Sequence, residues 1–116
     1  MEKVFICSAF RGDAGQNLSR AKAYCRWAAE HGKLPIAPHL IFPQFLDDEV
    51  PSQRELGIQM GLELLADCRQ LLYFGDRITP GMAREIARAR ELGIPVQHVP
   101  EEELMPAGRM EMGEMQ

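Results

Sequence analysis

The regular alternation of short apolar runs with segments of helical period constrains the fold of this chain more than any other feature. Four runs rich in β-branched, aromatic and aliphatic residues predict strands: VFIC (4–7), LPIAP (34–38), QLLYFG (70–75) and IPVQHV (94–99). Three segments between them predict helices, at about 17–30, 52–67 and 81–92. The alternation predicts an α/β fold, a three-layer, flavodoxin- or Rossmann-like parallel sheet of about four strands in the order 2-1-3-4 with helices on both faces.

The length and composition suit one compact domain, because the chain has 116 residues, of which 46% are hydrophobic and 26% charged. We expect this domain to span residues 1–100 and residues 101–116 to form a flexible, acidic, Met-rich tail. Residues 39–51 are apolar but broken by prolines, and they predict a long loop that packs on the domain. Ser52 and Glu55 follow it with the spacing of a capping box, which predicts that Ser52 caps the second helix.

Charge and cysteine content exclude several classes of protein. The formal net charge of −4 argues against binding to a nucleic acid polymer. No apolar run approaches the roughly 20 residues of a membrane span, and the first residues are not typical of a secretory signal. Cys7, Cys25 and Cys68 are too widely spaced for a zinc site or a disulfide framework, so we expect free thiols in a reducing cytoplasm.

Polar residues follow three of the predicted strands, and the carboxyl ends of parallel strands meet at one edge of a sheet. Ligands of open α/β sheets bind beyond that edge, near the point where the strand order reverses. The candidate binding residues in these three segments are Ser8, Arg11 and Gly12, then His39, Asp47 and Asp48, then Thr79, Gly81 and Met82. We expect their side chains to converge on one site.

Two of these segments could bind an anion. Arg11 offers a guanidinium beside Gly12, whose backbone allows close approach, although Arg11 could equally be a surface residue that pairs with Asp13. Thr79-Pro80-Gly81-Met82 opens the third helix, where free N–H groups and the helix dipole attract negative charge. An ordinary N-cap by threonine explains the same segment.

The remaining polar candidates each have a functional and a structural interpretation. His39 could bind a ligand or act as a base, or it could cap loop carbonyls. Asp47 and Asp48 could hold ribose hydroxyls, or they could keep the loop soluble. His31 and His98 are interpreted as structural.

Glu85 is the candidate reactive group, in the second turn of the third helix. The spacing of Met82, Ile86 and Ala89 indicates the buried face of that helix, and Glu85 lies on its flank. A carboxylate held there could attack a sugar carbon or stabilise a cationic transition state. The alternative is a solvated glutamate that pairs with Arg84 or Arg88. The sequence contains no HExxH, CxxC, GxSxG or P-loop motif, so neither a metal nor a cofactor is predicted.

Four segments in order resemble a known family: VFICSAFRGD, PIAPHLIFPQFLDD, GIQMGLELLADCRQLLYFG and TPGMAREIARARELGIPV. They cover most of residues 4–96 and resemble proteins with a nucleoside 2-deoxyribosyltransferase-like domain of the DUF4406 or DUF7768 type. More distantly they resemble the deoxynucleoside 5′-monophosphate N-glycosidases. The resemblance implies a small-molecule nucleotide or nucleoside substrate and a homodimer, without a cofactor.

The resemblance also assigns residues. In the N-glycosidases, a Ser-x-Gly-x-x-x-Glu segment holds the phosphate and supplies the nucleophile, and Thr79-x-Gly81-x-x-x-Glu85 keeps that spacing. Their first motif ends in Arg-Gly, as Arg11-Gly12 does here.

Three supporting polar groups of that family are replaced. Phe5 stands where the family has a tyrosine, Ala9 where it has a serine, and Gln59 near the position of an aspartate. An N-glycosidase or deoxyribosyltransferase-like enzyme therefore stands beside a second hypothesis, a nucleotide- or nucleotide-sugar-binding protein that senses its ligand without cleaving it. A third hypothesis is a small α/β domain that acts in assembly.

Overall fold

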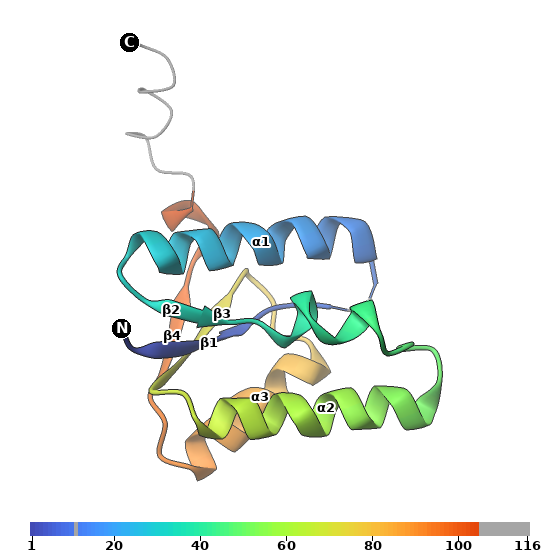
Figure 1. Ribbon diagram of the computed structural model, residues 1–116. Coiled ribbons are helices and arrows are strands. Elements are labelled where there is room, and N and C mark those ends of the chain that lie inside the picture. The colour runs from blue at the N-terminus through green and yellow to red at the C-terminus, as the bar shows by residue number, and fades with distance from the viewer. Residues whose placement is uncertain (11, 105–116) are drawn as a thin grey trace.

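The computed structural model describes residues 1–10 and 12–104, which form a sheet covered by helices on both faces. Its main elements in chain order are β1 (Lys3–Cys7), α1 (Ala14–Glu30), β2 (Leu34–Ile36), α2 (Pro51–Ala66), β3 (Gln70–Phe74), α3 (Pro80–Glu91) and β4 (Val96–Val99). The four strands are parallel in the order β2-β1-β3-β4, which confirms the predicted topology. Figure 1 shows α1 on one face of the sheet and α2 and α3 on the other.

The alternation of side chains along β1 divides the core into two layers. Val4 and Ile6 pack with residues of α1, whereas Phe5 and Cys7 pack with residues of α2 and α3. All four side chains are buried, because β1 lies between β2 and β3 and is covered on both faces. This central position fixes the end of β1, which borders the candidate site described below.

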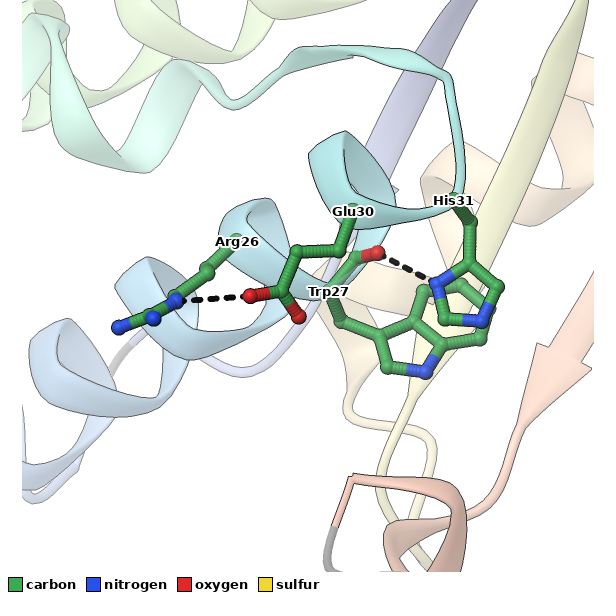
Figure 2. A network of polar contacts seen from close by, with 4 residues as sticks. All are labelled: Arg26, Trp27, Glu30 and His31. Atoms are coloured by element: carbon green, nitrogen blue, oxygen red, sulfur yellow. Dashed lines mark hydrogen bonds and ion pairs between the residues drawn. The ribbon is translucent and has the colours of Figure 1, made fainter. Parts of the chain in front are cut away.

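The two ends of α1 are closed by side chains. Asp13 caps its first turn by accepting a hydrogen bond from the Gln16 N–H at 3.2 Å. At the other end, shown in Figure 2, His31 Nδ1 lies 2.7 Å from the carbonyl oxygen of Trp27, and the two rings stack. His31 is thus structural, as predicted. His98 is structural too, with its Nε2 atom 2.7 Å from the carbonyl oxygen of Gly75.

The predicted capping box at Ser52 is wrong. Helix α2 begins at Pro51 and its N-cap is Val50. No side chain accepts a capping hydrogen bond from the N–H groups of the first turn. The reason is that proline, with its fixed φ and no N–H group, suits the first helical position, so the helix starts before Ser52. The segment before α2 contains two 3-10 turns, η1 (Pro38–Leu40) and η2 (Phe42–Gln44), within the loop predicted to pack.

The chain continues past β4 into a short 3-10 turn, η3 (Glu101–Glu103). The Tyr24 hydroxyl of α1 donates to a Glu101 carboxylate oxygen at 2.8 Å, and Leu104 packs against the core on the α1 side. The rest of the predicted tail, residues 105–116, lies outside the described residues, as does Arg11. Within the described ranges, no helix is long and apolar enough to cross a membrane.

Candidate active site

A pocket of about 460 Å³ lies beyond the carboxyl ends of β1 and β3, on the side of the sheet covered by α2 and α3. We call it the main pocket. Seven of the ten predicted site residues line it: Ser8, His39, Asp48, Thr79, Gly81, Met82 and Glu85. Residues far apart in the sequence therefore meet at the sheet edge, because three loops leave that edge together.

The other three predicted residues do not line this pocket. Gly12 lines a separate pocket of about 450 Å³ on the α1 side, although Thr79 borders both. Asp47 closes the turn before α2, because its N–H donates to Gln53 Oε1 at 2.6 Å and its carboxylate accepts from the Glu49 N–H at 2.9 Å. Arg11 is not among the residues that the structure describes.

The start of α3 forms one wall of the main pocket. Thr79 Oγ1 accepts a hydrogen bond from the Met82 N–H at 3.2 Å, which is the predicted N-cap. Pro80 has no N–H group, and the Met82 and Ala83 N–H groups both donate to Thr79. The Gly81 N–H is therefore the donor of this turn that has no acceptor among the described residues. This donor and the positive end of the helix dipole can bind an anion.

Glu85 lies at the floor of the main pocket with one carboxylate oxygen, Oε1, completely buried and without a hydrogen-bond partner. Burial raises its pKa from 4.5 to about 7, although the Cys7 thiol and the Arg84 guanidinium favour the charged form. Met82, Ile86 and Ala89 are the buried residues of α3, which confirms the predicted face. A carboxylate that is half ionised near neutral pH is suited to reaction with a bound molecule.

Ser8 is the second buried polar group of the main pocket. Its side chain is only 4% exposed, and its Oγ atom has no hydrogen-bond partner. Ser8 immediately follows β1, so its position is fixed by the central strand. Buried polar atoms are normally paired, and two orphans in the lining of one pocket indicate a site that a ligand or solvent completes.

His39 forms the wall between η1 and the end of β1. Its ring stacks on Phe10, with centroids 5.0 Å apart and planes inclined by 12°. Burial lowers its pKa, while a hydrogen bond with the Ser8 backbone and the Asp48 charge act in the opposite direction. His39 is therefore held in place by the loop after β1, and its contact with a ligand stays a prediction.

Sequence reasoning missed the cationic residues of the main pocket. Arg54 lines it, is half-buried, and forms no ion pair with any residue of the described ranges. Arg84 lines its mouth and pairs with Glu55 of α2 at 3.9 Å. The available signal for Arg54 was its spacing, because Arg54, Ile58 and Leu62 recur every four residues and all face the pocket.

No group of three or more His, Cys, Asp or Glu residues in the described part of the chain could hold a metal ion.

Comparison with known proteins gives one family and a fold. The family profile described as "Domain of unknown function (DUF7768)" matches residues 2–99. The fold is similar to that of a 2-deoxyribosyltransferase from the psychrotolerant bacterium Bacillus psychrosaccharolyticus, with a TM-score of 0.64 and 20% identity over 84% of this chain and 72% of that chain. It is also similar to Clostridium botulinum CMP N-glycosidase, BcmB, with a TM-score of 0.54 and 17% identity over 97% of this chain and 80% of that chain. No curated protein sequence matches the chain.

Proposed function

Because the chain belongs to the DUF7768 family and has the fold of a deoxyribosyltransferase, we propose that it cleaves or transfers the N-glycosidic bond of a nucleoside or nucleotide. Glu85 is the nucleophile in this proposal. The observation that carries it is the buried, unpartnered carboxylate oxygen of Glu85 at the floor of a pocket of about 460 Å³. The two similar structures are those of a 2-deoxyribosyltransferase and a CMP N-glycosidase, which supports the choice of bond.

The chemistry takes two steps. The Glu85 carboxylate attacks the anomeric carbon C1′, the C1′–N bond breaks, and its electron pair leaves with the base, which takes a proton from solvent. The resulting sugar ester of Glu85 is then attacked at C1′ by water or by a ring nitrogen of a second base, and in either case the attacking molecule releases a proton to solvent. The ester bond breaks and the carboxylate is regenerated.

The main pocket has groups suited to the rest of such a substrate. The Gly81 N–H and the dipole of α3 lie at the end where a 5′-phosphate would bind, and Arg84 lines the same pocket. Ser8 and Asp48 are oxygen-bearing side chains placed to contact sugar hydroxyls. Arg54 adds a second positive charge from α2. Its guanidinium can donate two parallel hydrogen bonds to one oxyanion.

A second candidate function is binding of the same ligand without cleavage. Phe5 is completely buried in the core and offers no hydroxyl to orient Glu85, and Gln59 is exposed and does not line the main pocket. This favours a nucleotide sensor, because loss of a group that stabilises the transition state costs about 100-fold or more in rate.

Incubation with ribo- and deoxyribonucleosides and their 5′-monophosphates, followed by chromatography for free base, tests the proposal. We expect release by the wild-type protein and loss of at least about 100-fold in Glu85→Gln, because the amide cannot act as the nucleophile. Glu91→Gln is the matched control, since Glu91 is exposed on α3 and away from the pocket. Ligand binding without release, equal in wild type and Glu85→Gln, would instead establish the binding protein.

The homodimer and the cytoplasmic location expected from the sequence stay predictions. Sedimentation velocity of the purified protein, with and without nucleotide, measures the first of them.

A further inference from the structure

A smaller compartment of about 90 Å³ opens beside the main pocket, between α2 and the turns η1 and η2. We call it the side compartment. Its walls are mostly apolar and include Pro38, Phe42, Leu46 and Ile58. The two spaces are continuous and Glu85 lies where they meet, because both are lined by the same six residues: Phe10, His39, Asp48, Arg54, Ile58 and Glu85.

We infer that the side compartment holds the base of the substrate and that its size selects a single-ring pyrimidine over a two-ring purine. The inference deepens the proposed function and rests on it, since it takes the main pocket to bind a nucleoside or nucleotide.

The arrangement of the two spaces orients the ligand. Thr79, Gly81 and Met82 line the main pocket but not the side compartment, so the anion-binding end and the apolar end lie on opposite sides of Glu85. With the phosphate at α3 and C1′ beside Glu85, the base extends into the side compartment. The flat faces of an aromatic base fit walls of phenylalanine, proline and leucine, while its polar edge needs hydrogen-bond partners.

The volume decides between the two classes of base. An apolar cavity of about 150 Å³ is filled by benzene, a single six-membered ring. The side compartment measures about 90 Å³ and is open toward the main pocket, so it can take one ring whose sugar-bearing edge stays outside. A purine carries a second fused ring, which would meet the walls.

Hydrogen bonds hold these walls in position, so the compartment does not widen freely. The Leu46 N–H donates to the Phe42 carbonyl at 2.8 Å, and Gln44 Nε2 donates to the Leu40 carbonyl at 2.7 Å. On the α2 side the loop packs against a residue without a side chain, because a Cβ atom at Gly57 would lie 3.5 Å from Leu46 Cδ1. The space between loop and helix at this point is therefore no wider than one methyl group.

Gln53 supplies the polar contact that a pyrimidine can use. Its Oε1 atom accepts the Asp47 N–H at 2.6 Å, which fixes the orientation of the side-chain amide. The amide NH₂ group is left as a donor in the lining of the side compartment. Cytosine, uracil and thymine all carry a carbonyl oxygen at C2 that can accept from it.

Isothermal titration calorimetry of the Glu85→Gln protein, which avoids turnover, tests the inference with CMP, UMP, AMP and GMP. We expect the pyrimidine nucleotides to bind at least tenfold more tightly than the purine nucleotides. Equal or tighter binding of AMP or GMP would overturn the inference.

Variants of the walls make the test specific. Phe42→Ala enlarges the side compartment, and we expect it to reduce the preference for pyrimidines to less than threefold. Phe45→Ala is the matched control, because Phe45 is 63% exposed, stacks edge-on against Phe42, and does not line the compartment. Leu46→Ala is a second enlarging variant, measured if Phe42→Ala unfolds. An unchanged preference in the folded variant would overturn the inference.

The amide contact has its own variant pair. Gln53→Leu should weaken binding of CMP and UMP at least fivefold, whereas Gln59→Leu, at an exposed position of the same helix, should leave it unchanged. Equal effects of the two substitutions would contradict the role of Gln53.

These outcomes separate the inference from the proposed catalysis. Pyrimidine nucleotides that bind selectively but release no base with the wild-type protein support the side compartment and refute the enzyme. Base released from purine nucleotides as fast as from pyrimidine nucleotides supports the enzyme and refutes the size selection. Absence of binding by all four nucleotides refutes the size selection, and absence of base release from every nucleoside and nucleotide tested refutes the enzyme.

Discussion

At Glu85 the cost of burying a charge gives the protein a dependence on pH. Because its pKa is about 7 in the folded protein and 4.5 in a solvated chain, the folded state binds the proton more tightly. The free energy of unfolding should therefore fall as pH rises from about 4.5 to 7 and then level off. At 1.36 kcal/mol for each pKa unit, the loss is on the order of 3 kcal/mol.

Urea unfolding of wild type and Glu85→Gln at pH 4.5, 6 and 8 measures this loss. We expect the two proteins to be about equally stable at pH 4.5 and Glu85→Gln to be the more stable at pH 8, because the amide never ionises. His39, whose pKa is lowered, contributes the opposite slope near its own titration, but it is present in both proteins and cancels in the difference. A difference that does not change with pH would show that Glu85 is solvated.

The same pKa predicts the pH dependence of catalysis. Attack requires the carboxylate, so kcat/KM for base release should rise with pH through a midpoint near 7. Burial and the Glu85 charge raise the pKa of the Cys7 thiol, which thus stays protonated. This thiol donates to the Met82 carbonyl at 3.8 Å and also favours the charged form of Glu85 as a nearby donor. Cys7→Ala removes this donor, and we expect the midpoint of the rate profile to move to higher pH.

Cys68→Ala is the control for Cys7→Ala. Cys68 is buried in the same core layer and its thiol also donates to a carbonyl, that of Leu64 at 3.4 Å, but it is not among the groups that shift the pKa of Glu85. It should lower stability, as any core truncation does, without moving the midpoint. If both substitutions moved the midpoint alike, the effect would come from packing instead of from the thiol near Glu85.

The predicted residues of the site were found in two ways. Ser8, His39 and Asp48 were found because the carboxyl ends of parallel strands meet at one sheet edge, and the residues of α3 because local chain geometry fixes them. Thr79 and Glu85 lie six positions apart on one cap and helix, so their relation follows from the sequence itself. Arg54 could not be placed in this way, because whether its face of α2 meets Glu85 depends on how two helices pack on the sheet. The unpartnered state of Ser8 Oγ likewise depends on neighbours from several elements.

At the scale of elements, strands and helices followed the pattern of apolar residues, but two helix starts did not. Helix α1 begins at Ala14, three residues before its predicted start, because Asp13 caps it. Helix α2 begins one residue early. The capping-box spacing of Ser52 and Glu55 competes with Pro51, whose backbone geometry places the first turn one residue earlier. Glu55 instead reaches across to Arg84 of α3 at 3.9 Å. A contact between helices of this kind cannot be read from the spacing within one of them.

This helix start leaves room for stabilisation. Val50 is the N-cap of α2 in an extended conformation and offers no acceptor to the first-turn N–H groups. Val50→Asp supplies that acceptor and a negative charge at the positive end of the helix dipole, so it should raise the free energy of unfolding by about 1 kcal/mol. Denaturant unfolding measures the gain.

Two controls accompany the Val50 prediction. Val50→Ala removes the same side chain without adding an acceptor and should give no gain. Thr79→Ala deletes the cap that α3 already has, so it should cost about 1 kcal/mol. A gain in Val50→Ala equal to that in Val50→Asp would mean that removal of an exposed valine, and not capping, is responsible.

At the scale of the whole molecule, the strand order was predictable because right-handed crossovers leave few arrangements for four alternating strands. The end of the fold was not. Residues 101–104 carry no core periodicity, yet Glu101 and Leu104 contact α1 and its core. One hydrogen bond and one apolar contact with distant residues leave no periodic signal in the sequence.

The contacts of Glu101 and Leu104 with α1 and its core predict where the chain can be shortened. A chain that ends at Leu104 keeps every contact that the structure describes, whereas one that ends at Pro100 loses the Glu101 carboxylate and the packing of Leu104. We expect the shorter chain to be less stable by about 3 kcal/mol, from a hydrogen bond to a charged group and a half-buried leucine. Urea unfolding of the two chains at one pH measures the difference.

Tyr24→Phe identifies the source of that difference. In the chain that ends at Leu104 it breaks the hydrogen bond to Glu101, and in the chain that ends at Pro100 the partner is already missing. The substitution should therefore cost about 1–2 kcal/mol more in the longer chain, which is the coupling energy of the pair. If Tyr24→Phe cost the same stability in both chains, Glu101 would not hold the end of β4 to α1. The domain would then end at residue 100, as expected from the sequence.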